Sequence, residues 1–111
     1  MAQFIFFYRA TPEAMQRMGS ATPEQQQAHM GKWQAWTESN AESLLNAGTP
    51  FSGGQVLTGS GSSDVDGTMM GYAVLQAEDM GAAQAILKTD PFLDQGEGCS
   101  IEVYECMSMP G

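Results

Sequence analysis

The unbroken apolar run at residues 3–8, Q-F-I-F-F-Y, limits the possible folds of this chain more than any other stretch. A strand with one face in water alternates apolar and polar residues, whereas this run is apolar on both sides. It therefore predicts a central strand that is covered on both faces. A chain of 111 residues has only one core. We therefore expect a single domain, residues 1–111, built in two layers.

A long helix is predicted over residues 22–48. The Thr22 hydroxyl can accept from the first-turn amides, Pro23 suits the first helical position, and Gln25 completes a capping box. Gly48 predicts the end of the helix, because glycine adopts the left-handed cap conformation at little cost. At helical spacing the apolar face that would pack on a sheet consists of Met30, Trp33, Thr37, Ala41, Leu44 and Leu45.

The remaining pattern predicts three more strands, at residues 55–58, 68–77 and 99–107, and a second helix that Glu78 or Asp79 caps. The Asp66-Gly67 pair predicts a hairpin that makes the strands at 55–58 and 68–77 antiparallel neighbours. The second helix ends at Asp90-Pro91. The order β-α-β-β-α-β predicts an α+β, ferredoxin-like fold, a four-stranded antiparallel sheet with two helices on one face.

One face of such a sheet has no cover from within the chain. Because the first strand is apolar on both sides, a second copy packing sheet against sheet is the simplest cover. The sequence therefore predicts a homodimer with the form of a dimeric α+β barrel.

Charge and motifs exclude several functional classes. A net charge of −9 repels phosphate backbones and anionic membranes, so we expect no nucleic-acid or membrane partner. Neither a membrane span nor a signal peptide is recognisable, which predicts a cytoplasmic protein. Cys99 and Cys106, about 23 Å apart on one strand, cannot bridge each other. Without zinc-ligand spacing, a phosphate-binding loop or a nucleophile elbow, we expect no metal and no cofactor.

The candidate site lies on the long helix, which carries His29, the only histidine of the chain, and both tryptophans. A histidine exchanges protons near neutral pH, so His29 is a candidate general acid or base. Trp33, Trp36 and Asn40 follow it at helical spacing and are candidate ligand-binding residues for a flat molecule with a polar edge. The alternative is that His29 bonds to backbone while the tryptophans fill core and interface.

Two further regions bear on this site. Asp64 or Asp66 could supply the carboxylate that an acid–base histidine needs, with Asp66 as the second candidate catalytic residue, although acids in such loops usually form turns. Tyr72, on the strand at residues 68–77, is expected to shape the pocket with the tryptophans. The methionines could line a pocket or simply fill the core.

The order of short motifs also resembles a known family. These motifs are F-I-F-F-Y-R, T-P-E-Q, H-M-G-K-W-Q-A-W, D-G, G-Y-A-V-L-Q-A-E-D-M and I-E-V-Y-E. Over nearly its whole length the chain is similar to the YCII-related proteins, including the Asp-Gly-Pro-Phe group. The resemblance implies a ferredoxin-like dimeric α+β barrel. It also implies enzymatic activity in some members, where a histidine paired with an aspartate is proposed to line a pocket, and association with transcriptional regulators in others.

Carried over by position, the family histidine matches His29. The aspartate falls near Asn46 and has no counterpart, and Asp66-Gly67-Thr68-Met69 departs from the Asp-Gly-Pro-Phe pattern. Two hypotheses follow. The first is a homodimer that binds a small organic ligand beside the long helix, without established catalysis. The second is a small cofactor-independent enzyme of proton transfer or hydrolysis, with His29 as acid or base.

Overall fold

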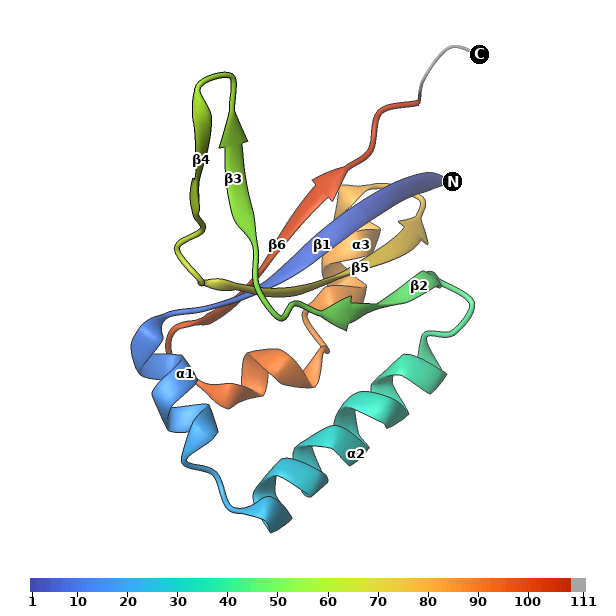
Figure 1. Cartoon of the computed structure of the whole chain (residues 1–111). Coiled ribbons are helices and arrows are strands. Elements are labelled where there is room, and N and C mark those ends of the chain that lie inside the picture. Colours follow the sequence, from blue (N-terminus) through green and yellow to red (C-terminus); the bar gives the residue numbers. More distant parts are fainter. Residues whose placement is uncertain (109–111) are drawn as a thin grey trace.

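The computed structural model describes residues 1–108 and shows an α+β fold (Figure 1). Its main sheet has four antiparallel strands in the order β2-β5-β1-β6, and β3 and β4 form a separate ribbon. The strands are β1 (Ala2–Ala10), β2 (Leu44–Pro50), β3 (Gln55–Thr58), β4 (Gly61–Asp64), β5 (Met69–Ala77) and β6 (Cys99–Glu105). The helices are α1 (Pro12–Gly19), α2 (Pro23–Ser39), α3 (Met80–Leu87) and the 3₁₀-helix η1 (Pro91–Gln95). The expected ferredoxin-like fold class is confirmed.

Strand β1 lies between β5 and β6, the central position that its apolar run predicts. Phe4 and Phe6 are fully buried and pack with Leu75 of β5 on the face that the helices cover. We call this the inner face of the sheet. Because side chains alternate along a strand, Ile5 and Phe7 lie on the opposite, outer face, where they are half-buried.

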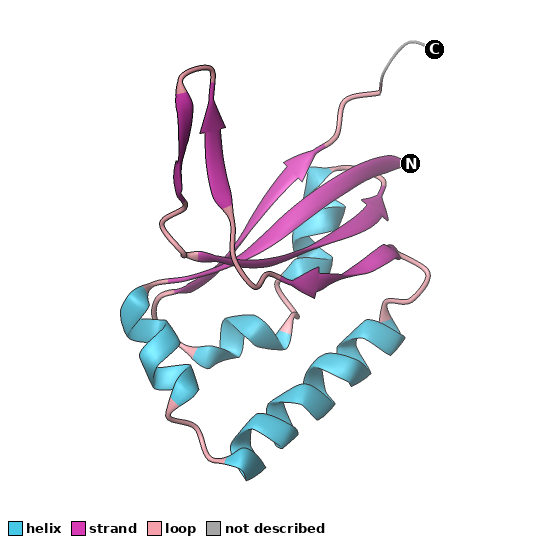
Figure 2. Cartoon of the chain, in the orientation of Figure 1, coloured by secondary structure: helices cyan, strands magenta, loops and turns pink. Residues whose placement is uncertain are grey.

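The inner face is covered by helices from two parts of the chain (Figure 2). Trp36 of α2 and Leu87 of α3 join the same buried cluster as Phe4 and Phe6. A second cluster, around Ala14 of α1 and Phe92 of η1, packs beside it. The expected two helices are thus supplemented by α1 and by η1.

Helix α2 begins where the sequence predicts and ends earlier. Thr22 and Gln25 form the reciprocal capping box. The Gln25 backbone amide donates to the Thr22 hydroxyl at 3.1 Å, and the Thr22 backbone amide donates to the Gln25 side-chain oxygen at 2.9 Å. The helix stops at Asn40, and the prediction that it continues to Gly48 is wrong. Gly48, with φ of 78°, instead belongs to β2 at an irregularity in its pairing with β5. A Cβ there would lie 1.6 Å from the Tyr72 carbonyl oxygen, so glycine is required for this close approach.

The inward side of α2 also differs from the predicted apolar face. Trp36 is its one buried residue, Met30 is 53% exposed, and Leu44 and Leu45 are in β2. The Trp36 indole N–H donates to the Thr89 hydroxyl at 2.9 Å, which fixes this side toward the sheet. Because Leu44 and Leu45 belong to β2, the apolar residues that remain in α2 do not form the predicted apolar face.

The pairing of residues 55–58 is a second correction. The sequence predicted that this strand would pair with the strand at 68–77, whereas β3 pairs with β4 through the Gly59-Ser60 turn. The sheet neighbour of β5 on that side is β2. The ribbon rises from the sheet on the side away from α1 and α2 (Figure 1). Within residues 1–108, no helix has the length and apolar character that crossing a membrane requires.

Candidate functional site

A cavity of about 330 Å³ lies between α2, the strand pair β2–β5, the end of β1 and η1. We call it the α2 cavity. Most of its walls are apolar, and its polar side chains come from both helices and from the sheet. The lining residues are Tyr8, Met18, His29, Met30, Trp33, Ala47, Gly48, Thr49, Pro50, Met70, Gly71, Tyr72, Phe92 and Gln95. Three of the residues singled out from the sequence, His29, Trp33 and Tyr72, are therefore brought together.

His29 is half-buried in the wall that α2 contributes. Its Nε2 atom lies 3.0 Å from the Nε2 atom of Gln95 in η1. An amide nitrogen donates, so this contact places the acceptor at Nε2 and the proton of the neutral imidazole at Nδ1. Among residues 1–108, no carboxylate lies within hydrogen-bonding distance of the ring. The imidazole is thus oriented by an amide and not by an acid.

A buried carboxylate, Asp90, stands behind Tyr8. Asp90 is 1% exposed, and its Oδ2 atom accepts a hydrogen bond of 2.6 Å from the Tyr8 hydroxyl. Its Oδ1 atom accepts from the Phe92 amide at 2.9 Å, which makes Asp90 the N-cap of η1. The Trp33 indole N–H in turn donates to the Tyr8 oxygen at 3.4 Å. One polar chain therefore connects the buried acid to the cavity wall.

Burial controls the acid–base properties of this pair. Removal from water raises the pKa of Asp90, although the hydrogen bonds from Tyr8 and Phe92 act in the opposite direction. Burial also raises the pKa of the Tyr8 phenol, and the hydrogen bond to Asp90 and its charge add to the increase. Tyr8 therefore keeps its proton and donates it toward Asp90.

Sequence reasoning assigned Asp90 only to the end of a helix. Its local signal is an acid directly before Pro91 and a short apolar run, which is typical of the start of a short helix. The partner that makes Asp90 a buried polar group is Tyr8, 82 positions earlier in the chain. Tyr8 was likewise assigned only to the first strand.

Two of the predicted ligand-binding residues lie away from the cavity wall. Trp36 is buried in the core and bonded to Thr89. The Asn40 amide donates to the Trp36 carbonyl at 2.8 Å at the end of α2. Tyr72 lines the cavity and stacks on Phe51, with ring centroids 5.9 Å apart.

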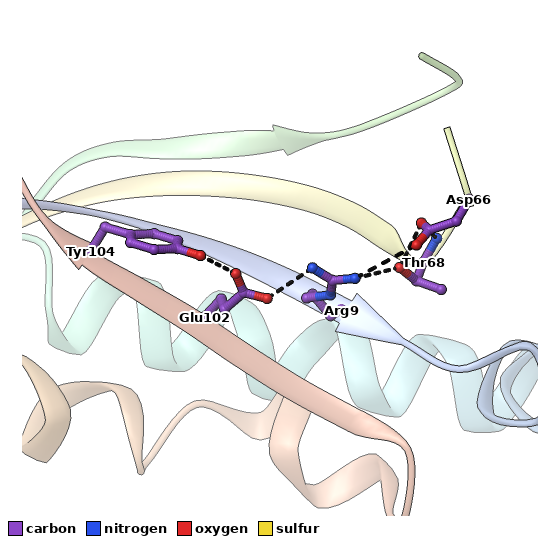
Figure 3. Close-up of polar contacts among 5 residues, drawn as sticks. All are labelled: Arg9, Asp66, Thr68, Glu102 and Tyr104. Carbon is purple, nitrogen blue, oxygen red and sulfur yellow. Dashed lines mark hydrogen bonds and ion pairs between the residues drawn. The ribbon is translucent and has the colours of Figure 1, made fainter. Parts of the chain in front are cut away.

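Asp66 belongs to a polar cluster on another part of the sheet (Figure 3). Its Oδ1 atom accepts from the Thr68 amide and hydroxyl at 3.0 and 2.8 Å, and its Oδ2 atom lies 3.9 Å from the Arg9 guanidinium. Arg9 also pairs with Glu102 at 2.8 Å, and Glu102 accepts from the Tyr104 hydroxyl. We call Arg9, Asp66, Thr68, Glu102 and Tyr104 the outer cluster. Asp66 is thus engaged with Thr68 and Arg9, outside the α2 cavity.

The described part of the chain offers no arrangement for a metal ion, since no three His, Cys, Asp or Glu side chains of residues 1–108 converge. Asp64 accepts from the Gln55 amide at 2.7 Å across the β3–β4 ribbon. Cys99 and Cys106 are both free thiols. The α2 cavity, which gathers His29 and Trp33 beside Tyr8, is therefore the candidate site.

Comparison with known proteins agrees with the fold. A model of the YCII-related domain matches residues 2–107. The chain also resembles the structure of 5-chloro-2-hydroxyhydroquinone dehydrochlorinase (TftG) from Burkholderia phenoliruptrix AC1100, solved in complex with 2,5-dihydroxybenzoquinone. The TM-score is 0.52 at 17% sequence identity, and the match covers 90% of each chain. No curated protein matches the chain in sequence.

Proposed function

The chain belongs to the family of YCII-related domains, and we propose that its α2 cavity binds a small, flat organic molecule. The observation that carries this proposal is the composition of the cavity wall. Trp33 and Phe92 supply aromatic surface, while His29 and Tyr8 supply polar groups. A mainly apolar pocket of about 330 Å³ with a few converging polar side chains is typical of small-molecule sites.

A substitution that fills the cavity tests this proposal. Ala47 lines the α2 cavity and is exposed, so Ala47→Phe places a ring in the cavity without enlarging a buried side chain. Ala41→Phe is the matched control, since Ala41 is exposed and lies outside the lining. Single-ring phenols, chosen because the structural neighbour holds 2,5-dihydroxybenzoquinone, serve as probes in ligand-observed NMR. Binding should persist in the control and be lost in Ala47→Phe, and equal binding by both variants contradicts the proposal.

A second candidate function is cofactor-independent acid–base chemistry at His29. The observation that favours it is that His29 and the Tyr8–Asp90 pair border the same cavity. The fold neighbour acts on 5-chloro-2-hydroxyhydroquinone, so this compound is a suitable first test substrate, with release of chloride as the measurement. General acid–base groups contribute about 10²- to 10⁴-fold to a rate.

The matched variants for this test lie on one helix. His29→Gln should reduce chloride release at least about 100-fold. Lys32→Gln, an exposed change three positions along α2, should leave it intact. No release by the unmodified protein, or release that His29→Gln leaves unchanged, contradicts this second function for this substrate.

We also propose that the protein acts as a homodimer whose second copy covers the outer face. Ile5 and Phe7 lie on this face, and Tyr104, which packs edge-to-face on Phe7 with ring centroids 6.1 Å apart, is 50% exposed. The β3–β4 ribbon rises on the same side and exposes Leu57 to 78% (Figure 1). Exposed apolar side chains of this kind favour a protein partner, and a symmetric copy presents the same side chains in return. Light scattering after size exclusion should give twice the chain mass of 11.9 kDa.

A further inference from the structure

The hydrogen bonds around Tyr8 determine which hydrogen-bonding role it has left for a ligand. The phenol has one proton, and this proton is donated to Asp90 at 2.6 Å. The two oxygens of Asp90 receive two donors, the Tyr8 hydroxyl and the Phe92 amide, which fits an ionised carboxylate that can only accept. The direction of the Tyr8 hydroxyl is therefore set by a group that cannot donate to it.

Toward any further partner, the Tyr8 oxygen can consequently act only as an acceptor. Of its two lone pairs, one is used by the Trp33 indole N–H at 3.4 Å. Tyr8 and Trp33 both line the α2 cavity, so the remaining lone pair is available at the wall where their polar ends meet. A ligand atom at this point must bring a proton of its own.

We propose that Tyr8 recognises a hydroxyl or N–H donor on a flat ring, and that Asp90 is the positioning residue that makes Tyr8 an acceptor. This inference rests on the proposed ligand-binding function and adds the chemical class of the ligand. An ether or carbonyl oxygen would meet the Tyr8 oxygen with no proton between them. The lining includes no Lys or Arg, which leaves His29 as the group that can offset a negative charge on a ligand.

Phenol and anisole form a probe pair that isolates this contact, since they differ by the methyl group that replaces the hydroxyl proton. A net hydrogen bond corresponds to about tenfold in affinity. The unmodified protein should therefore bind phenol about tenfold more tightly than anisole in an NMR titration. Equal affinities overturn the inference and leave ligand binding intact, whereas binding of neither probe contradicts the proposed function for single-ring ligands.

Three variants test the roles of the residues. Tyr8→Phe removes the acceptor and should bring the ratio of the two affinities to about one. In Asp90→Asn the new amide can donate to the Tyr8 oxygen, which frees the phenol proton to donate into the cavity. The preference for phenol should then disappear or reverse in favour of anisole. Asp94→Asn, an exposed change in the same 3₁₀-helix, should retain the tenfold preference.

The ratio of affinities separates a positioning role from a structural one. Loss of stability lowers binding of both probes together and leaves their ratio unchanged, so only a change at the Tyr8 oxygen alters it. If either Tyr8→Phe or Asp90→Asn keeps the preference for phenol, the inference is wrong. Circular dichroism confirms that each variant is folded before titration. Should Asp90→Asn fail to fold, Tyr8→Phe alone decides the outcome.

Discussion

Two carboxylates on opposite sides of the sheet show how differently this chain treats the same chemical group. Asp90, behind the inner face, is buried, receives hydrogen bonds from Tyr8 and Phe92, and has its pKa raised by burial. Glu102, in the outer cluster, has a side chain that is 38% exposed and pairs with Arg9. Hydrogen bonds from Tyr104 and Arg9 lower its pKa. The outer acid has an arginine partner and water, whereas the inner acid is removed from water and has no ion pair among residues 1–108.

This difference indicates which of the two is tied to function. A carboxylate on the surface with an arginine partner contributes little to stability and can be replaced without much effect. A buried carboxylate without a cation carries a desolvation cost that ordinary packing would avoid. Such costly groups gather at binding and catalytic sites. The chain retains the cost at Asp90, directly behind a residue that lines the α2 cavity.

The largest expected effect concerns the outer face and its proposed partner. Phe7→Glu places a charge in each of two symmetric copies of the interface, where it would be removed from water. We expect the dissociation constant of the dimer to rise at least about 100-fold, where each factor of ten corresponds to about 1.4 kcal/mol of association free energy. Analytical ultracentrifugation over a concentration series measures this change.

Gln84→Glu is the control for the added charge, because Gln84 is exposed on α3, away from the outer face. It should leave the association unchanged. A Phe7→Glu protein that remains folded and associates as strongly as the unmodified chain would show that the outer face is not the dimer interface.

The second effect in size is the loss of the inner acid. Asp90→Ala leaves the Tyr8 hydroxyl and the Phe92 amide without their acceptor and removes the cap of η1. Unpaired buried donors cost about 1–3 kcal/mol, and relief of the buried charge returns part of this. We expect the free energy of unfolding to fall by about 2 kcal/mol in urea denaturation. Asp94 lies in the same helix and is exposed, so Asp94→Ala should have no measurable effect on stability. Equal losses in both variants would show that the buried position of Asp90 does not matter for stability.

How well the sequence predicts each region depends on whether the determining contacts are local. The start of α2 was predicted correctly because Thr22 and Gln25 form its cap within one turn. Its end was not, because a glycine serves equally as a helix stop or at an irregular strand position. At Gly48 the strand position is determined by close contact with the Tyr72 carbonyl, which lies 24 positions away in the sequence. The same reasoning predicts His29 and Trp33 beside one another on α2 but cannot find Asp90, whose burial depends on Tyr8.

The contributions of Asp90 and Asp66 to stability should depend on pH in opposite directions. Because the pKa of Asp90 is raised in the folded state, the folded protein binds more protons at Asp90 than the unfolded chain does. This difference exists at pH values between the ordinary pKa of aspartate and the raised pKa of Asp90. Its contribution to stability is therefore greatest at low pH and falls as pH rises through that window. The pKa of Asp66 is lowered, chiefly by hydrogen bonds from Thr68, so its contribution is present above the ordinary value and is lost as pH falls.

Urea denaturation from about pH 3 to about pH 7 separates these contributions. The stability of the unmodified protein relative to Asp90→Asn should decline with rising pH, because the variant cannot titrate at that position. Relative to Asp66→Asn it should increase. Parallel curves for the two variants would mean that Asp90 and Asp66 have equivalent surroundings after all.

The smallest effect is expected from the cation of the outer cluster. Arg9→Gln removes the partner of Glu102 and the nearby charge at Asp66 (Figure 3), and both acids then rely on water and on their neighbouring hydroxyls. Because exposed ion pairs are screened, the loss of stability should be smaller than for Asp90→Ala and should shrink further in about 1 M salt. The urea midpoint at low and high salt measures both differences. A loss as large as that of Asp90→Ala, and unaffected by salt, would mean that Arg9 holds the outer cluster together as Asp90 holds Tyr8, and the contrast between the two faces would fail.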